Sequence, residues 1–155
     1  MPEPANVLIV ANRTAVAERL VDAVQRRAER SPARFRLVVP ATPRGLHRVV
    51  DPEVTGREEA FAQLERALPL LSPAAGSEVT GSVGDADPVA AIHDALGEHP
   101  CDELIISTLP RRISRWLHVD LPSKARGFEL PVTHVEAHDG GITATAPEAQ
   151  QAVAA

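Results

Sequence analysis

The sequence predicts a single α/β domain built on a doubly wound, Rossmann-like sheet of five parallel strands. Five short segments of strand character, several of them continuous runs of Val, Ile and Leu, are separated by four helical segments, three of which show a helical spacing of apolar residues. Continuous apolar runs are typical of strands buried on both faces, and the intervening helices imply right-handed crossovers. The 155 residues, 44% of them apolar, are enough for one core, and no repeat or linker divides them. We therefore expect a domain over residues 1–136 and a loose tail over 137–155.

The strands are expected where aliphatic and β-branched residues cluster between turn residues. The first run is continuous and follows a proline-containing start, and the second is closed by Pro40. The third alternates weakly between polar and apolar residues, the fourth is again continuous, and the fifth begins with Leu-Pro-Val. The five expected strands are Asn6–Ala11, Phe35–Val39, Glu78–Val83, Leu104–Ile106 and Leu130–Val135.

The first two helices are expected from apolar residues that recur three or four positions apart, which places them on one face. Ser31-Pro32 ends the first helix, and Pro69 should end or kink the second. The segment Ala41 to Thr55 between them shows no clear period, so we expect a long connection that is functional or mobile. The expected apolar faces are Val16, Leu20 and Val24 in the first helix and Phe61, Leu64, Leu68 and Leu71 in the second.

The last two helices are expected from their start signals. Asp87 caps the third helix with Pro88 at its first position, and Gly97 is placed to stop it. Asp120-Leu121-Pro122 starts a short fourth helix that ends near Gly127. The expected apolar face of the third helix is Val89, Ile92 and Leu96.

Composition excludes several function classes. A net charge of −5 argues against a general nucleic-acid binder, because phosphate backbones demand an excess of positive charge. The lone Cys101 excludes an internal disulfide and is interpreted as inert, and no Cys/His spacing suits a metal. No apolar run approaches the ~20 residues of a membrane helix, and no signal peptide is recognisable. We expect a cytoplasmic protein, and the use of 15 Arg against one Lys is typical of a GC-rich bacterial genome.

The sequence offers no convincing catalytic set, so we expect no enzyme, with slow nucleotide hydrolysis as the alternative. His93 and His134 fall on a predicted helix and strand and are interpreted as structural. Ser107 and Thr108 leave a strand as nucleophiles can, but no Gly-x-Ser-x-Gly elbow is present. The adjacent Asp102-Glu103 is interpreted as solvating the start of the fourth strand.

A ligand site is expected at one place in this fold. Ligands of doubly wound sheets bind outside the carboxyl ends of the strands, where the strand order reverses. If the fourth strand lies beside the first, the crevice is formed by the loops at 11–14 and 107–115. Residues 111–126 carry +4 while the rest of the chain carries −9, so the crevice favours an anion. The candidate ligand-binding residues are Asn12, Arg13, Thr14, Ser107, Thr108, Arg111, Arg112, Ser114 and Arg115.

Each of these candidates has a plainer interpretation. The arginines that follow the fourth strand can form an anion clamp, or they can be a solvated face or pair with carboxylates of a dimer partner. Asn12 and Thr14 can hold a ribose or base, although capping of the first helix is the interpretation we favour. Trp116 can pack its helix onto the sheet or anchor a subunit interface.

Three stretches of the sequence resemble the universal stress protein family: residues 7–15 (VLIVANRTA), residues 79–108 (VTGSVGDADPVAAIHDALGEHPCDELIIST) and residues 130–136 (LPVTHVE). The resemblance implies the family's five-stranded parallel sheet, which it shares with adenine nucleotide alpha hydrolase-like proteins. It also implies a homodimer formed through the last strand, Leu130 to Glu136. ATP-binding members hold the phosphates with Gly-x-x-Gly and, further on, Gly-Ser or Gly-Thr.

This chain departs from the family at those positions. The loop glycines fall on Ser107 and Pro110, and the later Gly-Ser pair falls near His118 to Asp120. The family's Asp-Gly after the first strand falls on Asn12 and Arg13. Glycine serves in such loops because backbone amides must approach phosphate oxygens closely, whereas proline has no amide to offer.

Two hypotheses follow from the resemblance and these departures. The first is a non-enzymatic, homodimeric regulatory or interaction domain of the stress-response kind that does not bind ATP in the usual family way. The alternative is a binder of AMP, cyclic AMP or another anionic metabolite, in which an Arg-rich loop replaces the glycine amides. No other cofactor, no nucleic acid and no membrane is implied.

Overall fold

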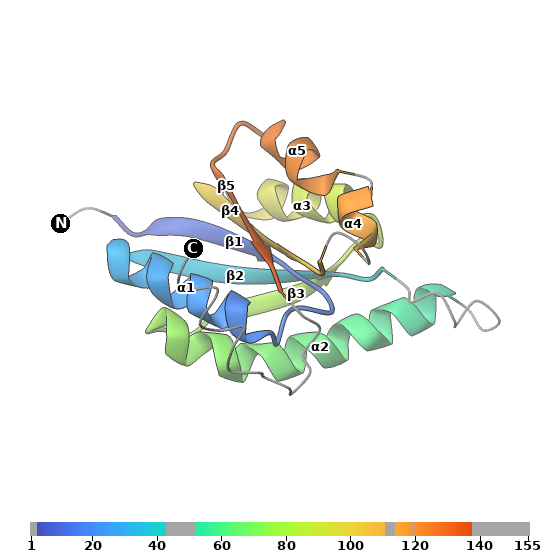
Figure 1. Cartoon of the computed structure of the whole chain (residues 1–155), viewed down its shortest axis with the longest axis horizontal. Coiled ribbons are helices and arrows are strands. Elements are labelled where there is room, and N and C mark those ends of the chain that lie inside the picture. Colours follow the sequence, from blue (N-terminus) through green and yellow to red (C-terminus); the bar gives the residue numbers. More distant parts are fainter. Residues whose placement is uncertain (1–2, 43–51, 111–113, 119, 138–155) are drawn as a thin grey trace.

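The computed structural model describes residues 3–42, 52–110, 114–118 and 120–137. Its centre is a five-stranded sheet with the order β3-β2-β1-β4-β5, in which every neighbouring pair is parallel (Figure 1). The predicted fold class is therefore confirmed, including the return of the chain that places the fourth strand beside the first. The strands are β1 Ala5–Val10, β2 Ala33–Pro40, β3 Thr80–Gly84, β4 Glu103–Thr108 and β5 Val132–Glu136.

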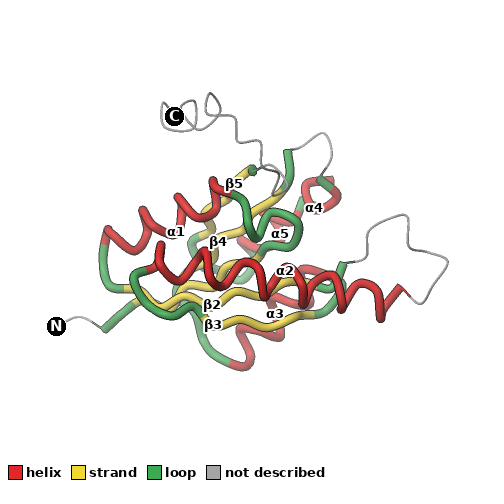
Figure 2. The backbone as a smooth tube through the Cα atoms, turned by 90° about the horizontal axis from the view of Figure 1, so that it is seen from below, coloured by secondary structure: helices red, strands yellow, loops and turns green. Residues whose placement is uncertain are grey.

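Helices cover both faces of the sheet. In Figure 1, α1 and α2 lie below the sheet while α3, α4 and α5 lie above it, and Figure 2 views the molecule from the side of α1 and α2. The helices are α1 Glu18–Arg30, α2 Pro52–Ala75, α3 Pro88–Glu98, α4 Arg115–His118 and α5 Leu121–Arg126.

The middle strand β1 shows why the first apolar run is continuous. Val7 and Ile9 belong to the core under α1 and α2, whereas Leu8 and Val10 belong to the core under α3 and α5. Successive strand residues point to opposite faces, so a strand covered on both sides needs apolar side chains at every position.

The long helix α2 differs from the prediction in two ways. Its buried face includes Ala60 and Leu64, whereas Phe61 is 52% exposed, so the predicted face was displaced by about one residue at that end. The helix also continues through Pro69, which lies on its exposed side. A carbonyl that loses its helical partner there can be hydrated, which lowers the cost of the proline. The predicted loop is shorter than expected, since the helix begins at Pro52 and residues 43–51 lie outside the described residues.

The α3–α5 side follows the prediction more closely. The backbone N–H of Val89 donates to the Asp87 side chain over 3.0 Å, which confirms the cap of α3. Gly97 does not stop α3, which continues to Glu98. Trp116 is buried in the core of this face, which supports packing rather than an interface as its role.

The described part of the chain extends one residue beyond the predicted domain end. Ala137, assigned to the tail from the sequence, is buried, and its N–H donates to the carbonyl of Thr108 over 2.8 Å. Residues 138–155, the rest of the predicted tail, lie outside the described residues.

Candidate functional site

The carboxyl ends of β1 and β4 lie side by side at the centre of the sheet. Val10, the last residue of β1, is in register with Ile106, and β4 continues beyond it through Ser107 and Thr108, which pair with β5. This is the position at which the strand order reverses, as predicted, and the ligand crevice expected there stays a prediction.

The polar side chains after β1 are turned inward. Thr14 and Ser107 share a hydrogen bond of 2.7 Å between their hydroxyl oxygens, and they are only 2% and 0% exposed. The side-chain amide of Asn12 donates to the carbonyl of Pro40 over 2.6 Å. The predicted capping of α1 by Asn12 or Thr14 is therefore wrong. The backbone turns twice between Asn12 and Ala17 before α1 begins at Glu18, and no side chain caps it.

The polar side chains after β4 are also engaged within the protein. Thr108 shares a hydrogen bond of 2.8 Å between its hydroxyl and Nε2 of His134 on β5. Ser114 accepts a bond of 3.1 Å from the N–H of Leu117 and so caps α4. Both Thr108 and Ser114 are buried. The hydroxyls predicted as ligand contacts thus join the turn after β1 to β4, join β4 to β5, and cap the start of α4.

The predicted arginine clamp lies largely beyond what the structure describes. Arg111 and Arg112 fall outside the described residues, and for Arg115 only the backbone position at the start of α4 is described. Arg13 lies on the turn after β1, half-buried and in contact with the rest of the protein. The clamp remains a prediction.

Asp120 lies just before α5 with φ 55° and ψ 48°, in the left-handed region that favours glycine. This is close to the position at which the family's later glycine was expected. Asp tolerates this conformation better than most residues, but its carboxylate brings a negative charge. Asp120 thus has a backbone conformation that suits glycine.

The opposite, amino-terminal end of the sheet holds an ion pair that the sequence interpretation missed. Arg27 of α1 and Glu103 of β4 form two parallel hydrogen bonds of 2.7 and 3.1 Å, with side chains 8% and 19% exposed. The interpretation of Asp102-Glu103 as a solvated strand entrance is therefore wrong for Glu103, whereas Asp102 is exposed, as expected, and also accepts a bond of 2.8 Å from the N–H of Asn6. The sequence feature that could have revealed this ion pair is the position of Arg27, three residues after the apolar Val24 on the same face of α1.

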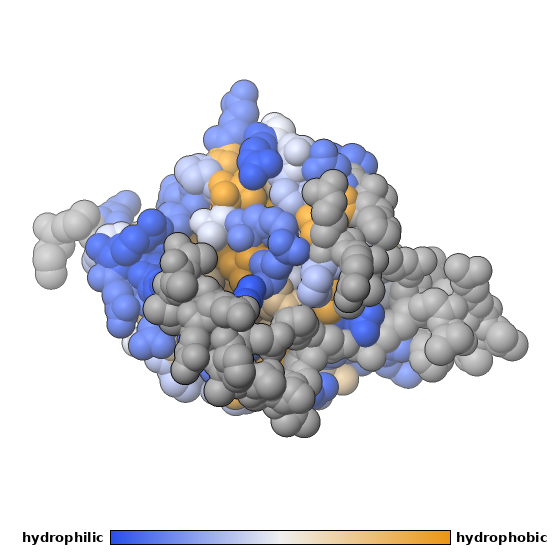
Figure 3. Space-filling model, in the orientation of Figure 1, coloured by the Kyte–Doolittle hydropathy of each residue, from blue (hydrophilic) through white to orange (hydrophobic). Residues whose placement is uncertain are grey.

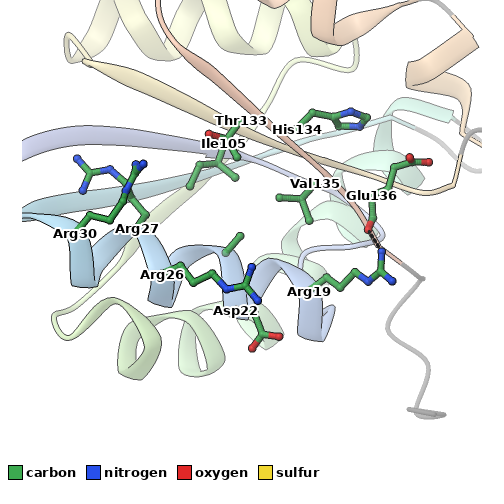
Figure 4. Close-up of a pocket in the computed structure, with 11 residues that line it drawn as sticks. Arg19, Asp22, Arg26, Arg27, Arg30, Ile105, Thr133, His134, Val135 and Glu136 are labelled. Carbon is green, nitrogen blue, oxygen red and sulfur yellow. Dashed lines mark hydrogen bonds between the residues drawn. The ribbon is translucent and has the colours of Figure 1, made fainter. Parts of the chain in front are cut away.

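A groove with a volume of about 490 Å³ lies between α1 and the edge strand β5. Figure 4 shows its basic wall on α1 and its floor on the sheet. Sequence reasoning did not find this site, because it concentrated on the loop after β4. Its lining includes Arg19, Asp22, Arg26 and Arg30 from α1, and Val135 and Glu136 from β5.

His134 and His93 lie in different surroundings. Burial lowers the pKa of His134, with the Arg126 charge acting in the same direction and the Glu136 charge opposing it. The structural role predicted for His134 is confirmed by its bond to Thr108. His93, by contrast, is exposed, with Nδ1 at 3.7 Å from the carboxylate of Asp94.

The described residues contain neither a metal-binding cluster nor a helix that could cross a membrane. Within the described ranges, no group of three or more His, Cys, Asp or Glu side chains is arranged to hold a metal ion. Within the same ranges, every helix is too short or too polar to cross a bilayer.

Comparison with known proteins relates the fold to one class. No protein-family model matches the sequence, and no curated protein is significantly similar to it. Solved structures do match: a universal stress family protein from Burkholderia pseudomallei has a TM-score of 0.60 at 17% identity, over 86% of this chain and 96% of that one. A universal stress protein in complex with cAMP has a TM-score of 0.58 at 16% identity, over 86% and 97%. A universal stress family protein from Arabidopsis thaliana with AMP bound has a TM-score of 0.55 at 13% identity, over 94% and 95%.

These matches span nearly the whole of each chain, so they concern the complete fold. The class defined by sheet order and helix placement is the doubly wound α/β domain. Within that class, the chain has the fold of the universal stress proteins.

Proposed function

We propose that this chain is a non-enzymatic regulatory or interaction domain of the universal stress protein family, and that it does not bind ATP in the family's usual way. A role in the stress response of a bacterial cytoplasm is part of the proposal, as is a folding unit that ends near residue 136. The observation that carries it is the buried hydrogen bond between Thr14 and Ser107 at the carboxyl ends of β1 and β4.

That bond matters because it engages the hydroxyl groups of Thr14 and Ser107, which a nucleotide bound there would need as free hydrogen-bond donors. A phosphate oxygen at Ser107 would compete with Thr14 for a hydroxyl that is fully buried. Pro110 has no N–H, so the loop lacks one of the amides that cradle phosphate. The cost of leaving either hydroxyl without its partner is about 1–3 kcal/mol, which a ligand would have to offset.

A homodimer through the last strand, Leu130 to Glu136, is the second part of the proposal. Within the described residues, strand β5 is at the edge of the sheet and pairs with β4 alone. Figure 3 shows apolar surface bordered by hydrophilic surface on the face where β5 lies at the front. An exposed edge invites pairing with a second copy, and a two-fold axis makes that pairing antiparallel.

The dimer is tested by sedimentation equilibrium. The wild-type chain is expected to sediment as a dimer, and Thr133→Lys, which places a cation on the exposed edge, is expected to weaken it. Exposed Arg66→Lys on α2 serves as the control and should leave the dimer unchanged. A wild-type chain that stays monomeric at high concentration refutes this part.

The second candidate function is the binding of AMP, cyclic AMP or another anionic metabolite in the β1–β4 crevice. It is favoured by structural neighbours that hold cAMP and AMP. In this chain the contacts would come from Arg111, Arg112 and Arg115 rather than from glycine amides.

A thermal-shift series separates the two functions. The purified chain is heated with ATP, AMP and cyclic AMP, each with and without Mg²⁺. A ligand at about 100 times its dissociation constant stabilises the folded state by about 2.7 kcal/mol. The first function predicts no shift with ATP. A shift with AMP or cyclic AMP that is lost in Arg111→Ala/Arg112→Ala but kept in Arg66→Ala supports the second, and a large shift with ATP contradicts the first.

A further inference from the structure

The arginines of α1 form a row along the groove beside β5. Arg19, Arg26 and Arg30 are separated by seven and four residues, so they lie within about 40° of one another around the helix axis. The buried face of α1, with Leu20 and Val24, points to the core. The row therefore runs along the edge of the helix that faces β5, and the close-up in Figure 4 shows these side chains along the groove.

The arginines at the groove differ in what they already bind. Arg27 is held by Glu103 and by Ser31, and Arg19 donates to the carbonyl of Glu136 over 3.3 Å. Arg30 has a side chain 69% exposed and only a long contact of 3.9 Å to Glu103. These arginines are therefore engaged to different degrees by partners within the protein.

Arg26 is the exception in this row. Among the described residues it makes no hydrogen bond and no ion pair, although its side chain lines the groove. Asp22, one turn before it, is the nearest acidic residue of α1 on this side. A guanidinium group carries five donors in a planar fork, so Arg26 leaves a strong anion-binding capacity unused at the middle of the row.

The groove is also positively charged in a chain that is negative overall. Its arginines, Arg19, Arg26, Arg27 and Arg30, stand against the carboxylates of Asp22, Glu103 and Glu136. The whole chain carries −5. A concave surface with local positive charge concentrates small anions near it.

We propose that the groove between α1 and β5 is a binding site for a small organic anion, with Arg26 as the principal ligand. A phosphate or carboxylate group accepts hydrogen bonds from Arg26, within reach of Arg19 and Arg30. The apolar part of the ligand lies against Val135 and Ile105, which form the floor. The volume of about 490 Å³ suits a small ligand of this kind.

This site is separate from the crevice between β1 and β4. The crevice is formed by the loops after those strands, whereas the groove is formed by the body of α1 and the edge strand. Anion binding at the two places can therefore be distinguished by mutation, and the groove proposal does not depend on the function proposed for the crevice.

The test is isothermal titration calorimetry at low ionic strength, below about 20 mM salt, so that screening does not hide a weak anion site. Pyrophosphate probes phosphate chemistry and citrate probes carboxylate chemistry. One of the two is expected to bind with a stoichiometry of one per chain. Arg26→Ala should weaken binding about tenfold, because it removes a charge-assisted forked contact, and Arg26→Lys should recover part of it.

Location is tested by variants and by a direct readout. Arg66→Ala on α2, outside the groove lining, should bind as the wild type does, and backbone amide shifts on titration should fall on Ala23 and Thr133–Glu136. Binding that survives in Arg26→Ala but is lost in Arg111→Ala/Arg112→Ala would assign the anion to the crevice and overturn this proposal. No binding of either probe also overturns it. Thermal midpoints of Arg26→Ala and wild type should agree, since Arg26 has no partner to lose among the described residues.

Discussion

Replacing Arg27 by methionine should cost this protein more stability than any other single arginine substitution at the groove. Methionine keeps most of the aliphatic volume but removes the guanidinium group. Glu103 then loses both of its hydrogen bonds, of 2.7 and 3.1 Å, and Ser31 loses the donor that reaches its carbonyl and hydroxyl. The carboxylate of Glu103 is left 19% exposed beside the core.

The expected loss of unfolding free energy follows from the burial of the Arg27–Glu103 pair. Removing one partner of a fully buried pair costs about 3–5 kcal/mol, chiefly because the other charge remains without compensation. Glu103 retains some contact with water, which places the expected loss at the low end, about 3 kcal/mol. For a domain of this length, that loss lowers the thermal midpoint by roughly 6–12 °C.

Urea unfolding followed by the fluorescence of Trp116, the only tryptophan and a buried one, measures the effect. Arg27→Met/Glu103→Leu removes both charges and should recover most of the lost stability, since a hydrophobic replacement of a buried pair is often neutral. Two results would refute the reasoning. One is a loss below about 1 kcal/mol for Arg27→Met, the value of an exposed pair. The other is a double variant as unstable as the sum of the single ones.

Three further predictions concern the crevice, the packing of α3 and the response to pH. Thr14→Val should destabilise by about 1–3 kcal/mol in urea unfolding, because it leaves the buried Ser107 hydroxyl without its partner, and adding Ser107→Ala should recover part of that loss. Gly84→Ala should cost about 1–3 kcal/mol by the same measurement, since its new methyl would lie 2.9 Å from the Cβ of Ala91 and push α3 outward; an unchanged midpoint would contradict this. Burial lowers the pKa of folded His134, so the unfolded chain binds more protons as pH falls from about 6.5 toward the lowered pKa, and stability decreases in that window. His134→Gln should flatten this decrease when unfolding free energies are compared between about pH 7.5 and 5, and an identical slope would show that His134 does not cause it.

Much of the fold could be predicted from the sequence, because the signals for strands, helices and caps lie within short stretches of the chain. The alternation of strand segments and amphipathic helices indicated a parallel sheet, and the cap of α3 was recognisable from Asp87 and Pro88. The strand order was also anticipated from the outward winding typical of this class. Two expectations for α2 differ from the structure. The predicted apolar face included Phe61, which is exposed, and the helix was expected to end or kink at Pro69, which lies inside it. Neither is decided by spacing alone, because the cost of a proline depends on whether its neighbouring carbonyl can reach water.

The candidate site was predictable in position but not in detail. The carboxyl ends of β1 and β4 follow from topology, and Asn12, Thr14, Ser107 and Thr108 do lie there. Their hydrogen-bond partners do not follow, since Thr14 and Ser107 are 93 residues apart in the chain. A hydroxyl that looks available in the sequence can be fully used by a partner that only the fold supplies.

By itself, the sequence determined the class of fold and the strands whose carboxyl ends meet where the strand order reverses, because both follow from strand and helix signals carried by residues close together in the chain. The tertiary structure alone decided which polar groups are already paired and which remain available. It joined Arg27 to Glu103 across 76 residues, and it placed Arg26 in a groove with β5, which begins more than a hundred residues later. Charges and hydroxyls acquire their energetic role from burial and from partners, and both are properties of packing rather than of sequence order.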